Sequence, residues 1–208
     1  MIAKRIFDLF VAIPGLISLL PFFLFAAVWI KADSKGPILF RQERVGHFGI
    51  PFWIYKFRTM YQDTEANGLL TVGNDSRITK AGAFLRHYKL DELPQLINVI
   101  LGNMSLVGPR PEVAEYVAHY PPEVRNIVLS VPPGITDYSS ILFEDESSLL
   151  GKFDNPEKAY LEEILPIKLH YCQKYVTDRS VKLDFKLILL TLRKILKLHC
   201  SIPNIQLP

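Results

Sequence analysis

A long apolar run near the N-terminus limits this chain to folds that can shelter it from water. From Ile6 to Ile30 almost every residue is apolar, and the interruptions are Asp8, Pro14-Gly15, Ser18 and Pro21. The run is long enough for a membrane-crossing helix, which needs about 20 residues. A secretory signal fits less well, because no small-residue cleavage site follows and residues 31–34 lead directly into the rest of the chain.

Two features favour a helix that enters the membrane, bends and leaves by the same face. Pro21 lacks the N–H of an intrahelical hydrogen bond and therefore kinks the helix near its middle. Basic residues lie at both ends of the run, whereas a single crossing favours positive charge on one side only. Spanning helices also contain proline, so a crossing helix stays open as the alternative to a re-entrant one.

The composition suits one membrane-associated domain. At 208 residues and 49% apolar content the chain can bury one core, and a formal net charge of +3 is too small to indicate a nucleic-acid binder. Cys172 and Cys200 show no paired spacing and the five histidines are scattered, which predicts free thiols in a reducing compartment and no transition-metal site. Basic residues cluster in two places that suit an anionic membrane surface. These are Lys4, Arg5, Lys31, Lys35, Arg41 and Arg44, and then Lys182, Lys186, Arg193, Lys194 and Lys197.

Two adjacent carboxylates, Asp91 and Glu92, mark the candidate site. They precede the pattern Leu93, Leu96, Ile97, Ile100, Leu101, whose spacing predicts one buried face of a helix. Asp91 is then an N-cap or first-turn residue, and Pro94 is tolerated because its missing N–H would be unpaired there anyway. The simplest function of the pair is to cap the helix and complement its dipole.

Arginines on both sides of the pair suggest a second role. Arg86 precedes the pair. Arg110 follows it, after a glycine-containing turn, and stands between two prolines. Two guanidiniums could therefore meet at the same helix end. A helix N-terminus holds anions, and arginine suits bidentate contacts with phosphate. A carboxylate beside a bound phosphate can bind Mg²⁺ or act as the nucleophile that takes up a phosphoryl group.

Two segments upstream, PILFRQERVG and IPFWIYKFRTM, predict a β-hairpin with Gly46 and Gly49 in its turn. The hairpin carries basic residues that could face a phosphate site or line a solvated strand face. They are Arg41, Arg44, Lys56 and Arg58. For Arg41 and Arg44 the two interpretations are equally open.

The motif LDELPQLINVILGNMSLVGPRP at residues 90–111, with KFRTM at residues 56–60, closely resembles the bacterial sugar transferase family, the monotopic phosphoglycosyl transferases. The resemblance extends from Lys4 to about Leu190. It implies that Asp91 is the nucleophile and that Glu92 helps to hold Mg²⁺. It also implies phosphate contacts from Arg86, Arg110, Lys56 and Arg58, a supporting role for Asp184, and a re-entrant helix broken at a Ser-Pro pair. Here the pair is Leu20-Pro21, with Ser18 two residues before Leu20.

The resemblance also implies an activity. The family transfers a phosphosugar from a nucleotide diphosphate sugar, here expected to be a UDP-sugar, to polyprenyl (undecaprenyl) phosphate, with release of UMP through a covalent aspartyl intermediate. This is the first membrane step of glycoconjugate synthesis, such as that of exopolysaccharide, at the cytoplasmic face of the bacterial inner membrane. The alternatives are a membrane-anchored nucleotide-sugar hydrolase and a non-catalytic, membrane-tethered scaffold that binds anions. The sugar, lipid length, pathway and oligomeric state stay open, a homodimer being one option.

The chain departs from the family pattern at several positions. Asn103 and Cys172 stand where relatives usually carry Asp. After Gly134, Asp137-Tyr138-Ser139-Ser140 and the acidic residues 144–146 replace a Gln-Val-x-Gly-Arg motif, so the arginine of that motif, a candidate donor contact in the family, is absent. We expect these changes to affect which sugar nucleotide is used.

Together these features predict an α+β fold. Residues 1–35 form the re-entrant membrane helix, and residues 36–208 form a continuous catalytic domain with a small β-hairpin, mainly helical structure and interfacial amphipathic helices. Residues 63–76 are a predicted surface loop. Helices are predicted from Thr79 toward Arg86 and over 123–131, 156–176 and 180–199. The helix at 156–176 is expected either to bend or to divide at Pro166. The last helix either lies at the membrane interface or packs on the core with a solvated basic face.

Overall fold

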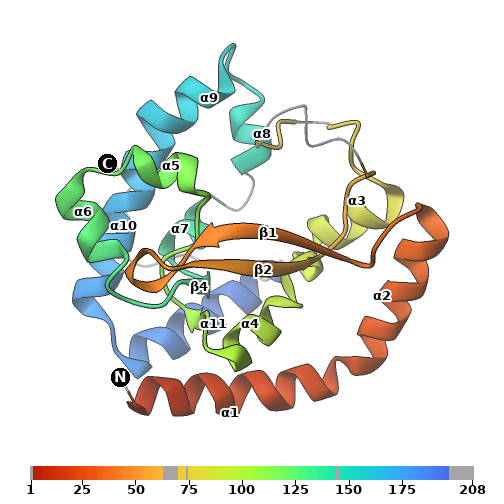
Figure 1. Cartoon of the computed structure of the whole chain (residues 1–208), viewed down its shortest axis with the longest axis horizontal. Helices are drawn as coiled ribbons and strands as arrows, with labels where there is room; N and C mark the ends of the chain where they lie inside the picture. Colours follow the sequence, from red (N-terminus) through yellow and green to blue (C-terminus); the bar gives the residue numbers. More distant parts are fainter. Residues whose placement is uncertain (1, 63–69, 74, 144–145, 197–208) are drawn as a thin grey trace.

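The computed structural model describes residues 2–62, 70–73, 75–143 and 146–196, a mixture of helices and two small sheets (Figure 1). In the first half lie α1 (Ile2–Ser18), α2 (Leu20–Asp33), β1 (Leu39–Val45), β2 (Pro51–Phe57), α3 (Lys80–His87), α4 (Gln95–Leu101) and β3 (Ser105–Val107). The second half contains α5 (Ala114–Ala118), α6 (Pro122–Val128), β4 (Gly134–Thr136), α7 (Tyr138–Leu142), α8 (Glu146–Leu150), α9 (Pro156–Ala159), α10 (Leu165–Asp178) and α11 (Val181–Ile195).

The apolar N-terminal run forms two helices that meet at an angle. Within the described residues no single helix is both long and apolar enough to cross a bilayer, but α1 and α2 together meet those criteria with a bend of 58° between them. The bend lies at Leu19, and Pro21 occupies the first turn of α2, where its missing N–H costs least. Ser18 Oγ donates to the Gly15 carbonyl at 2.9 Å, so a hydroxyl does satisfy a backbone acceptor beside the break. This shape agrees with the predicted bend, while the re-entrant position in a membrane stays a prediction.

The predicted hairpin is confirmed. β1 and β2 pair antiparallel, with Leu39 opposite Phe57 and Val45 opposite Pro51. Gly46 begins the connection and Gly49 has a φ of 79°, a left-handed conformation that glycine adopts without strain. The alternation places Phe52 and Ile54 in the core and exposes Trp53.

A second sheet was not predicted from the sequence. β3 and β4 pair in parallel, joining Ser105 to Gly134 and Val107 to Thr136. Each strand has only three residues, too few for a clear alternation of polar and apolar positions. The loop that follows β3, residues 108–113, carries Arg110, and we call it the arginine loop. The pairing of β3 with β4 therefore positions the start of this loop.

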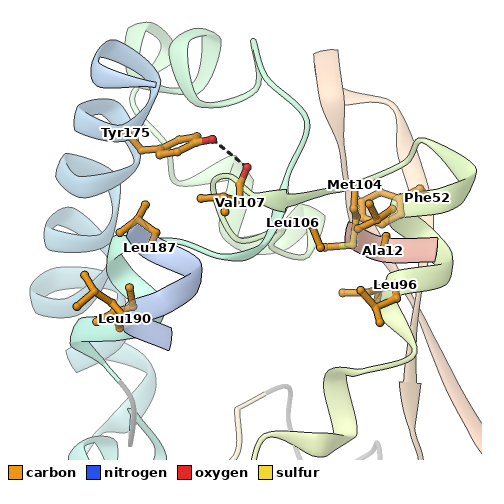
Figure 2. Packing of buried hydrophobic residues seen from close by; sticks show 12 residues of the cluster. Ala12, Phe52, Leu96, Met104, Leu106, Val107, Tyr175, Leu187 and Leu190 are labelled. Carbon is orange, nitrogen blue, oxygen red and sulfur yellow. Dashed lines mark hydrogen bonds between the residues drawn. The ribbon is translucent and has the colours of Figure 1, made fainter. Parts of the chain in front are cut away.

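The main core lies between the N-terminal helix, the hairpin and the C-terminal helices. Ala12 of α1, Phe52 of β2 and Leu96 of α4 pack around Met104 and Leu106, and Val107 continues the cluster toward Leu187 and Leu190 of α11 (Figure 2). A second cluster joins α5 and α6 to α9 and α10, and a third joins α2 to α3 and the end of β2. Because α1 contributes to the main cluster, the apolar run is packed onto the body of the protein along one face.

Polar contacts also fasten α1 to this body. Asp8 is buried and accepts a hydrogen bond from Ser105 Oγ at 2.7 Å and one from the Leu106 N–H at 3.2 Å. Lys4 Nζ pairs with Asp184 Oδ2 of α11 at 2.6 Å. The opposite face of α1 is exposed and apolar, with Ile6 63% and Phe10 77% exposed. The one charged residue of the apolar run, Asp8, is thus directed at β3 and away from that exposed face.

The C-terminal helices follow the prediction with one refinement. A π-helical turn, Tyr160–Ile164, separates α9 from α10 just before Pro166, whose missing N–H interrupts regular α-helical bonding. α11 packs on the core through Leu187 and Leu190, yet it also exposes Phe185 by 54% and Leu192 by 50%. Core packing of α11 is therefore confirmed, and an interfacial role for its outer face stays a prediction.

Several predicted features lie outside the described residues. The proposed surface loop at 63–76 falls mostly on residues 63–69 and 74, which the structure does not describe. The same holds for residues 144–145 of the acidic segment, for Lys197 and His199 at the end of the predicted last helix, and for Cys200 after it.

Two helical glycines should respond oppositely to substitution by alanine. A Cβ on Gly82 of α3 would lie 2.0 Å from the Thr59 carbonyl oxygen, whereas a Cβ on Gly15 of α1 would be 3.8 Å from Leu96 Cδ1, an ordinary contact. Helix propensity alone favours alanine by about 1 kcal/mol at both positions. We expect Gly15→Ala to raise the midpoint of thermal unfolding in detergent and Gly82→Ala to lower it. Stabilisation by Gly82→Ala would contradict this close approach of α3 to Thr59.

Candidate active site

The paired carboxylates lie in a 3-10 turn, Leu90–Glu92, and not in the first turn of α4. The predicted N-cap role of Asp91 is therefore wrong, because α4 begins only at Gln95 with Pro94 in the capping position. Pro94 cannot donate an N–H to the Leu90 carbonyl, so the helix does not extend back to the pair. The turn starts at Lys89, whose φ of 54° is left-handed. Leu101, predicted on the buried face, is 62% exposed.

Glu92 is the centre of an ion-pair cluster. Lys56 Nζ lies 2.8 Å from Glu92 Oε1, and the Arg110 guanidinium binds both carboxylate oxygens, with Nη1 3.0 Å from Oε2. The side chain of Glu92 is 13% exposed and that of Arg110 is 31% exposed. The structure thus brings together three of the predicted residues from β2, the 3-10 turn and the arginine loop.

These contacts determine the charge on Glu92. Burial alone would raise the pKa of this carboxyl, but attraction by Arg110 and then Lys56 outweighs burial and holds the pKa well below its usual range. Burial lowers the pKa of Lys56, and Glu92 opposes that shift. Glu92 therefore remains ionised at neutral pH, with its charge offset by two cations.

Asp91 has a different environment. Only 8% of the surface of Asp91 is exposed to solvent. In the part of the chain that the structure describes, its carboxylate accepts no hydrogen bond from any side chain or backbone N–H. Burial, followed by repulsion from Glu92, raises the pKa of Asp91, while Lys56, Arg86 and Arg110 act in the opposite direction. Arg86 forms no ion pair with a carboxylate of the described residues. The cluster thus holds one fixed carboxylate and one that keeps both oxygens free.

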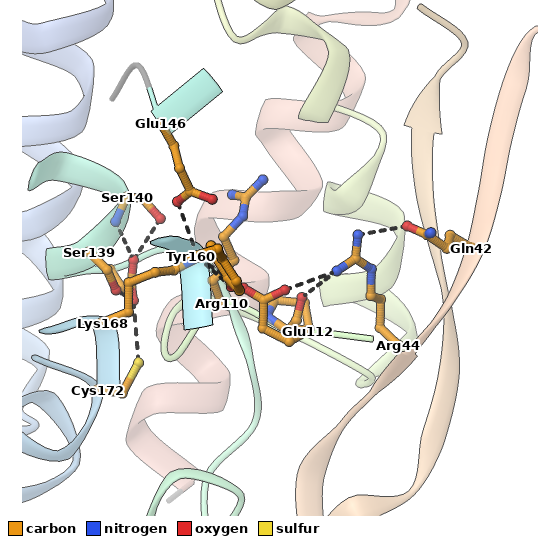
Figure 3. Close-up of polar contacts among 12 residues, drawn as sticks. Gln42, Arg44, Arg110, Glu112, Ser139, Ser140, Glu146, Tyr160, Lys168 and Cys172 are labelled. Atoms are coloured by element: carbon orange, nitrogen blue, oxygen red, sulfur yellow. Dashed lines mark hydrogen bonds and ion pairs between the residues drawn. The ribbon is translucent and has the colours of Figure 1, made fainter. Parts of the chain in front are cut away.

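A second buried carboxylate, Glu112, holds the arginine loop in place (Figure 3). Tyr160 Oη donates to Glu112 Oε1 at 2.8 Å, and Lys168 Nζ lies 2.9 Å from the same oxygen. Arg44 Nη1 contacts Glu112 Oε2 and the Pro111 carbonyl, each at 3.3 Å. Burial would raise the pKa of Glu112, but Lys168 and Arg44 lower it to about 2. Segments from β1, the π-helical turn and α10 therefore meet two residues after Arg110.

Lys168 extends this network to α8. Its Nζ lies 3.2 Å from Glu146 Oε2, and its side chain is 9% exposed. Sequence reasoning missed Glu112, Tyr160 and Lys168. One signal was present, since Lys168 stands between Leu165 and Leu169 on the buried face of a helix, and a lysine there needs a buried partner. The identity of that partner, 56 positions away, cannot be read from the sequence.

Other predicted residues lie away from Glu92. Arg58 is 4% exposed and donates to the Ser34 carbonyl at 2.6 Å and to the Ile30 carbonyl at 3.3 Å, so it fastens the end of α2 and does not join the cluster. The reason is that β2 ends at Phe57, and strand alternation no longer orients residue 58 with Lys56. Arg41 lies over the Tyr55 ring at 5.2 Å. Pro21 remains at the bend between α1 and α2.

Asp184 reaches the site only indirectly. Besides Lys4, its partner is Tyr175, whose hydroxyl lies 2.8 Å from Asp184 Oδ1 and 2.9 Å from the Val107 carbonyl. Val107 is three residues before Arg110. Asp184 thus contacts, through Tyr175, the strand that leads into the arginine loop, and its supporting role in the site stays a prediction.

The residues that depart from the family pattern have different environments in the structure. Asn103 is exposed after the C-terminal end of α4, the end remote from the 3-10 turn. Cys172 is buried with its Sγ 3.8 Å from Asp137 Oδ2, and burial raises the pKa of its thiol well above the usual value. Asp137 caps α7 by accepting from the Ser140 N–H at 2.7 Å. The residues after Gly134 thus form a buried polar cap beside the Glu112 network.

Asp91 and Glu92 are the two carboxylates that could hold a metal ion at this site. Among the described residues no group of three or more His, Cys, Asp or Glu side chains converges on a point suitable for a metal ion. Mg²⁺ does not require such a cage, since it commonly binds one or two carboxylates and completes its shell with substrate phosphates and water. Asp91 and the Oε2 of Glu92 retain oxygen lone pairs, so this pair fits Mg²⁺ bound together with a phosphate substrate.

Comparison with known proteins gives a consistent result. A sequence model described as bacterial sugar transferase matches residues 1–198. The uncharacterized sugar transferase EpsL of Bacillus subtilis (strain 168) is 37% identical over 94% of this chain and 88% of its own length.

Longer relatives carry more specific names. UDP-glucose:undecaprenyl-phosphate glucose-1-phosphate transferase of Klebsiella pneumoniae is 37% identical over 93% of this chain, and UDP-N-acetylgalactosamine-undecaprenyl-phosphate N-acetylgalactosaminephosphotransferase of Aeromonas hydrophila is 34% identical over 93%. The chain spans 40% of the first relative and 43% of the second.

The Glu112 network makes stability depend on pH in the acid range. The folded-state pKa of about 2 lies below the ordinary value of 4.5, so the stabilisation is fully present above pH 4.5 and is lost as pH falls toward 2. We expect Glu112→Gln to lower the free energy of unfolding by about 3 kcal/mol at pH 7, with a deficit that shrinks below pH 4.5. Urea titrations of both proteins across pH 2–7 measure this.

The exposed Glu163 on the π-helical turn provides the matched control for that experiment. Glu163→Gln should follow the wild-type stability at every pH. A pH-independent deficit in Glu112→Gln would show that packing and not charge explains the loss.

Proposed function

This chain belongs to the bacterial sugar transferase family, and we propose that it transfers a phosphosugar from a nucleotide diphosphate sugar to a polyprenyl phosphate. The observation that carries the proposal is the contrast within the carboxylate pair. Glu92 is fixed by Arg110 and Lys56, whereas Asp91 beside it keeps both oxygens free of hydrogen bonds from the described residues. A nucleophile needs accessible lone pairs, and the adjacent fixed charges can hold a phosphate against it.

The donor half-reaction follows from this arrangement. A carboxylate oxygen of Asp91 attacks the phosphorus of the sugar-bearing phosphate, the bond from that phosphorus to the bridging oxygen breaks, and UMP leaves with the electron pair. No proton transfer is needed, because Asp91 attacks as an anion. Lys56, Arg86 and Arg110 lower the pKa of Asp91 against the effects of burial and Glu92, and so favour this anionic form.

The acceptor half-reaction regenerates the enzyme. A phosphate oxygen of polyprenyl phosphate attacks the phosphorus of the aspartyl phosphosugar, and the Asp91 carboxylate leaves. The product is a polyprenyl diphosphate sugar. Arg110 and Lys56, held by Glu92, would offset charge on the non-bridging oxygens in both steps without having to move.

Mg²⁺ is the cofactor of the proposal. Glu92 would hold it together with donor phosphate oxygens, and it would supply charge neutralisation at the transferring phosphoryl group. Removal of Mg²⁺ with a chelator should abolish UMP release. It should also remove any rise in the thermal midpoint that Mg²⁺ and UMP together produce, which is a binding measurement independent of turnover.

The names of the relatives and the bent helix pair suggest substrates and location. Both longer relatives are named for UDP-sugar donors and undecaprenyl phosphate, and we extend that donor class and acceptor to this chain. The exposed apolar faces of α1 and α2 suit a re-entrant insertion at the cytoplasmic face of the bacterial inner membrane, where a soluble donor and a lipid acceptor meet.

Asp91→Asn should abolish lipid-dependent release of UMP. Purified protein in detergent is given Mg²⁺ and a panel of UDP-sugars, with and without undecaprenyl phosphate, and UMP is measured. The amide lacks the anionic oxygen that attacks phosphorus, so a drop of at least about 10³-fold is expected. The exposed Asp154 provides the control, since Asp154→Asn should retain wild-type turnover.

The alternatives give other results in the same assay. UMP release that does not require lipid would indicate a nucleotide-sugar hydrolase. No release with any donor would favour a non-catalytic scaffold. Full turnover by Asp91→Asn would overturn the covalent mechanism even if the overall transfer were confirmed.

The two basic residues of the KFRTM motif should separate into different roles. Loss of the Lys56 ammonium removes a charged contact worth about 1.5–3 kcal/mol, so Lys56→Met should reduce kcat/KM for the donor at least about tenfold. Arg58→Met should leave kcat/KM within about twofold, yet lower the thermal midpoint because three contacts to the end of α2 are lost. A large loss of donor kcat/KM in Arg58→Met at normal stability would return Arg58 to the phosphate contacts.

A further inference from the structure

Five aromatic side chains form a continuous row between the N-terminal helix pair and the candidate site. Phe25 and Trp29 of α2 lie 5.7 Å apart between ring centroids, and Trp29 lies 5.2 Å from Phe84 of α3. Phe84 is 4.9 Å from Tyr88, which is 4.8 Å from His87. We call these five residues the aromatic row.

Core packing accounts for only one member of the row. Trp29 packs against the apolar cluster between α2 and α3, in which Ile30 and Leu85 are fully buried. Phe25, Phe84 and Tyr88 do not belong to that cluster. In the row itself Phe25 is 60% exposed, Phe84 is 41% exposed and Tyr88 is 39% exposed. Exposed rings in contact with one another form a surface that can bind an apolar molecule.

The two ends of the row differ in chemistry. At the α2 end it continues the exposed apolar face of the helix pair, where Leu24 is 70% and Val28 is 71% exposed. At the α3 end it reaches Tyr88, three residues before Asp91, beside a helix terminus that carries Arg86. Arg86 has no carboxylate partner among the described residues, and its charge acts on Asp91. The row therefore joins a lipid-compatible surface to a cation at the nucleophile.

We infer that the aromatic row is the binding surface for the hydrocarbon chain of the polyprenyl phosphate acceptor, with Arg86 receiving its phosphate. The inference rests on the proposed function, because that function requires a lipid phosphate to reach Asp91. A molecule with a long unsaturated hydrocarbon chain and a terminal phosphate monoester matches both ends of the row. The alternative occupant is the headgroup region of the surrounding phospholipid, where aromatic residues also gather.

Steady-state kinetics of ring-removing variants provide the first test. Trp29→Leu and Phe84→Leu keep the surface apolar but remove the ring contacts. Each should raise KM for undecaprenyl phosphate about fivefold to tenfold. The exchange of labelled UMP into the UDP-sugar in the absence of lipid, which reports only the donor half-reaction, should be unchanged in both variants.

Two exposed aromatic residues outside the row serve as controls. Trp53 on β2 is 55% exposed and Phe10 on α1 is 77% exposed. Trp53→Leu and Phe10→Leu should leave KM for undecaprenyl phosphate within about twofold. An equal rise of KM in Phe10→Leu would assign the effect to general membrane anchoring and overturn the inference, as would an unchanged KM in both row variants.

A binding measurement keeps this inference separate from the proposed reaction. The chain has two tryptophans, so Trp53→Phe leaves Trp29 as the sole tryptophan reporter. Titration with undecaprenyl phosphate in detergent should change its fluorescence saturably, and phosphatidylglycerol or undecaprenol at the same concentrations should not. Equal responses to phosphatidylglycerol would identify bulk lipid as the occupant. If wild type showed no UMP exchange but Trp29 still responded selectively, the covalent mechanism would fail while the acceptor surface stood.

Discussion

The arrangement of the site depends on the burial of one carboxylate, Glu92. A carboxylate removed from water remains ionised only when charged donors replace its lost hydration. Those donors come from distant parts of the chain, Lys56 from the end of the hairpin and Arg110 from the loop after β3. The ion pairs that stabilise the charge of Glu92 therefore bring three segments to one point. Glu112, two residues after Arg110, is stabilised in the same way by Arg44, Tyr160 and Lys168. The arginine loop is therefore held by ion pairs at both Arg110 and Glu112.

Elements with a strong local signal could be predicted from the sequence. The hairpin, the start of α3 at the Thr79 cap, the bend near Pro21 and the division before Pro166 each depend on residues close together in the chain. The position of Asp91 was mispredicted within its own motif, because the helical spacing from Leu93 onward conceals that Pro94 prevents an extension of α4 toward the pair. Local patterns thus identify the element more securely than the residue at which it begins.

Contacts between distant side chains could be predicted only in part. Glu92, Arg110 and Lys56 were expected at one site because the motif of a known family contains all three, but their ion pairs with one another were not predicted. Arg58 belongs to the same motif, yet it turns to the end of α2, since the strand that would orient it ends one residue earlier. The partners of Lys168 and the parallel pairing of β3 with β4 depend on how distant segments pack, which no short pattern encodes. The structure was needed to find what holds the arginine loop.

The contacts of α1 bear on attempts to make a soluble version of the protein by truncation. Asp8 accepts hydrogen bonds from Ser105 and Leu106, Lys4 neutralises Asp184, and Arg5 donates to the carbonyls of Val99 and Ile100 at the end of α4. Removing α1 would strip β3 and α4 of these partners as well as removing an apolar surface. A truncated domain would thus carry unpaired buried groups directly beneath the arginine loop. In this protein the apolar N-terminal segment is also part of the framework on which the proposed chemistry would take place.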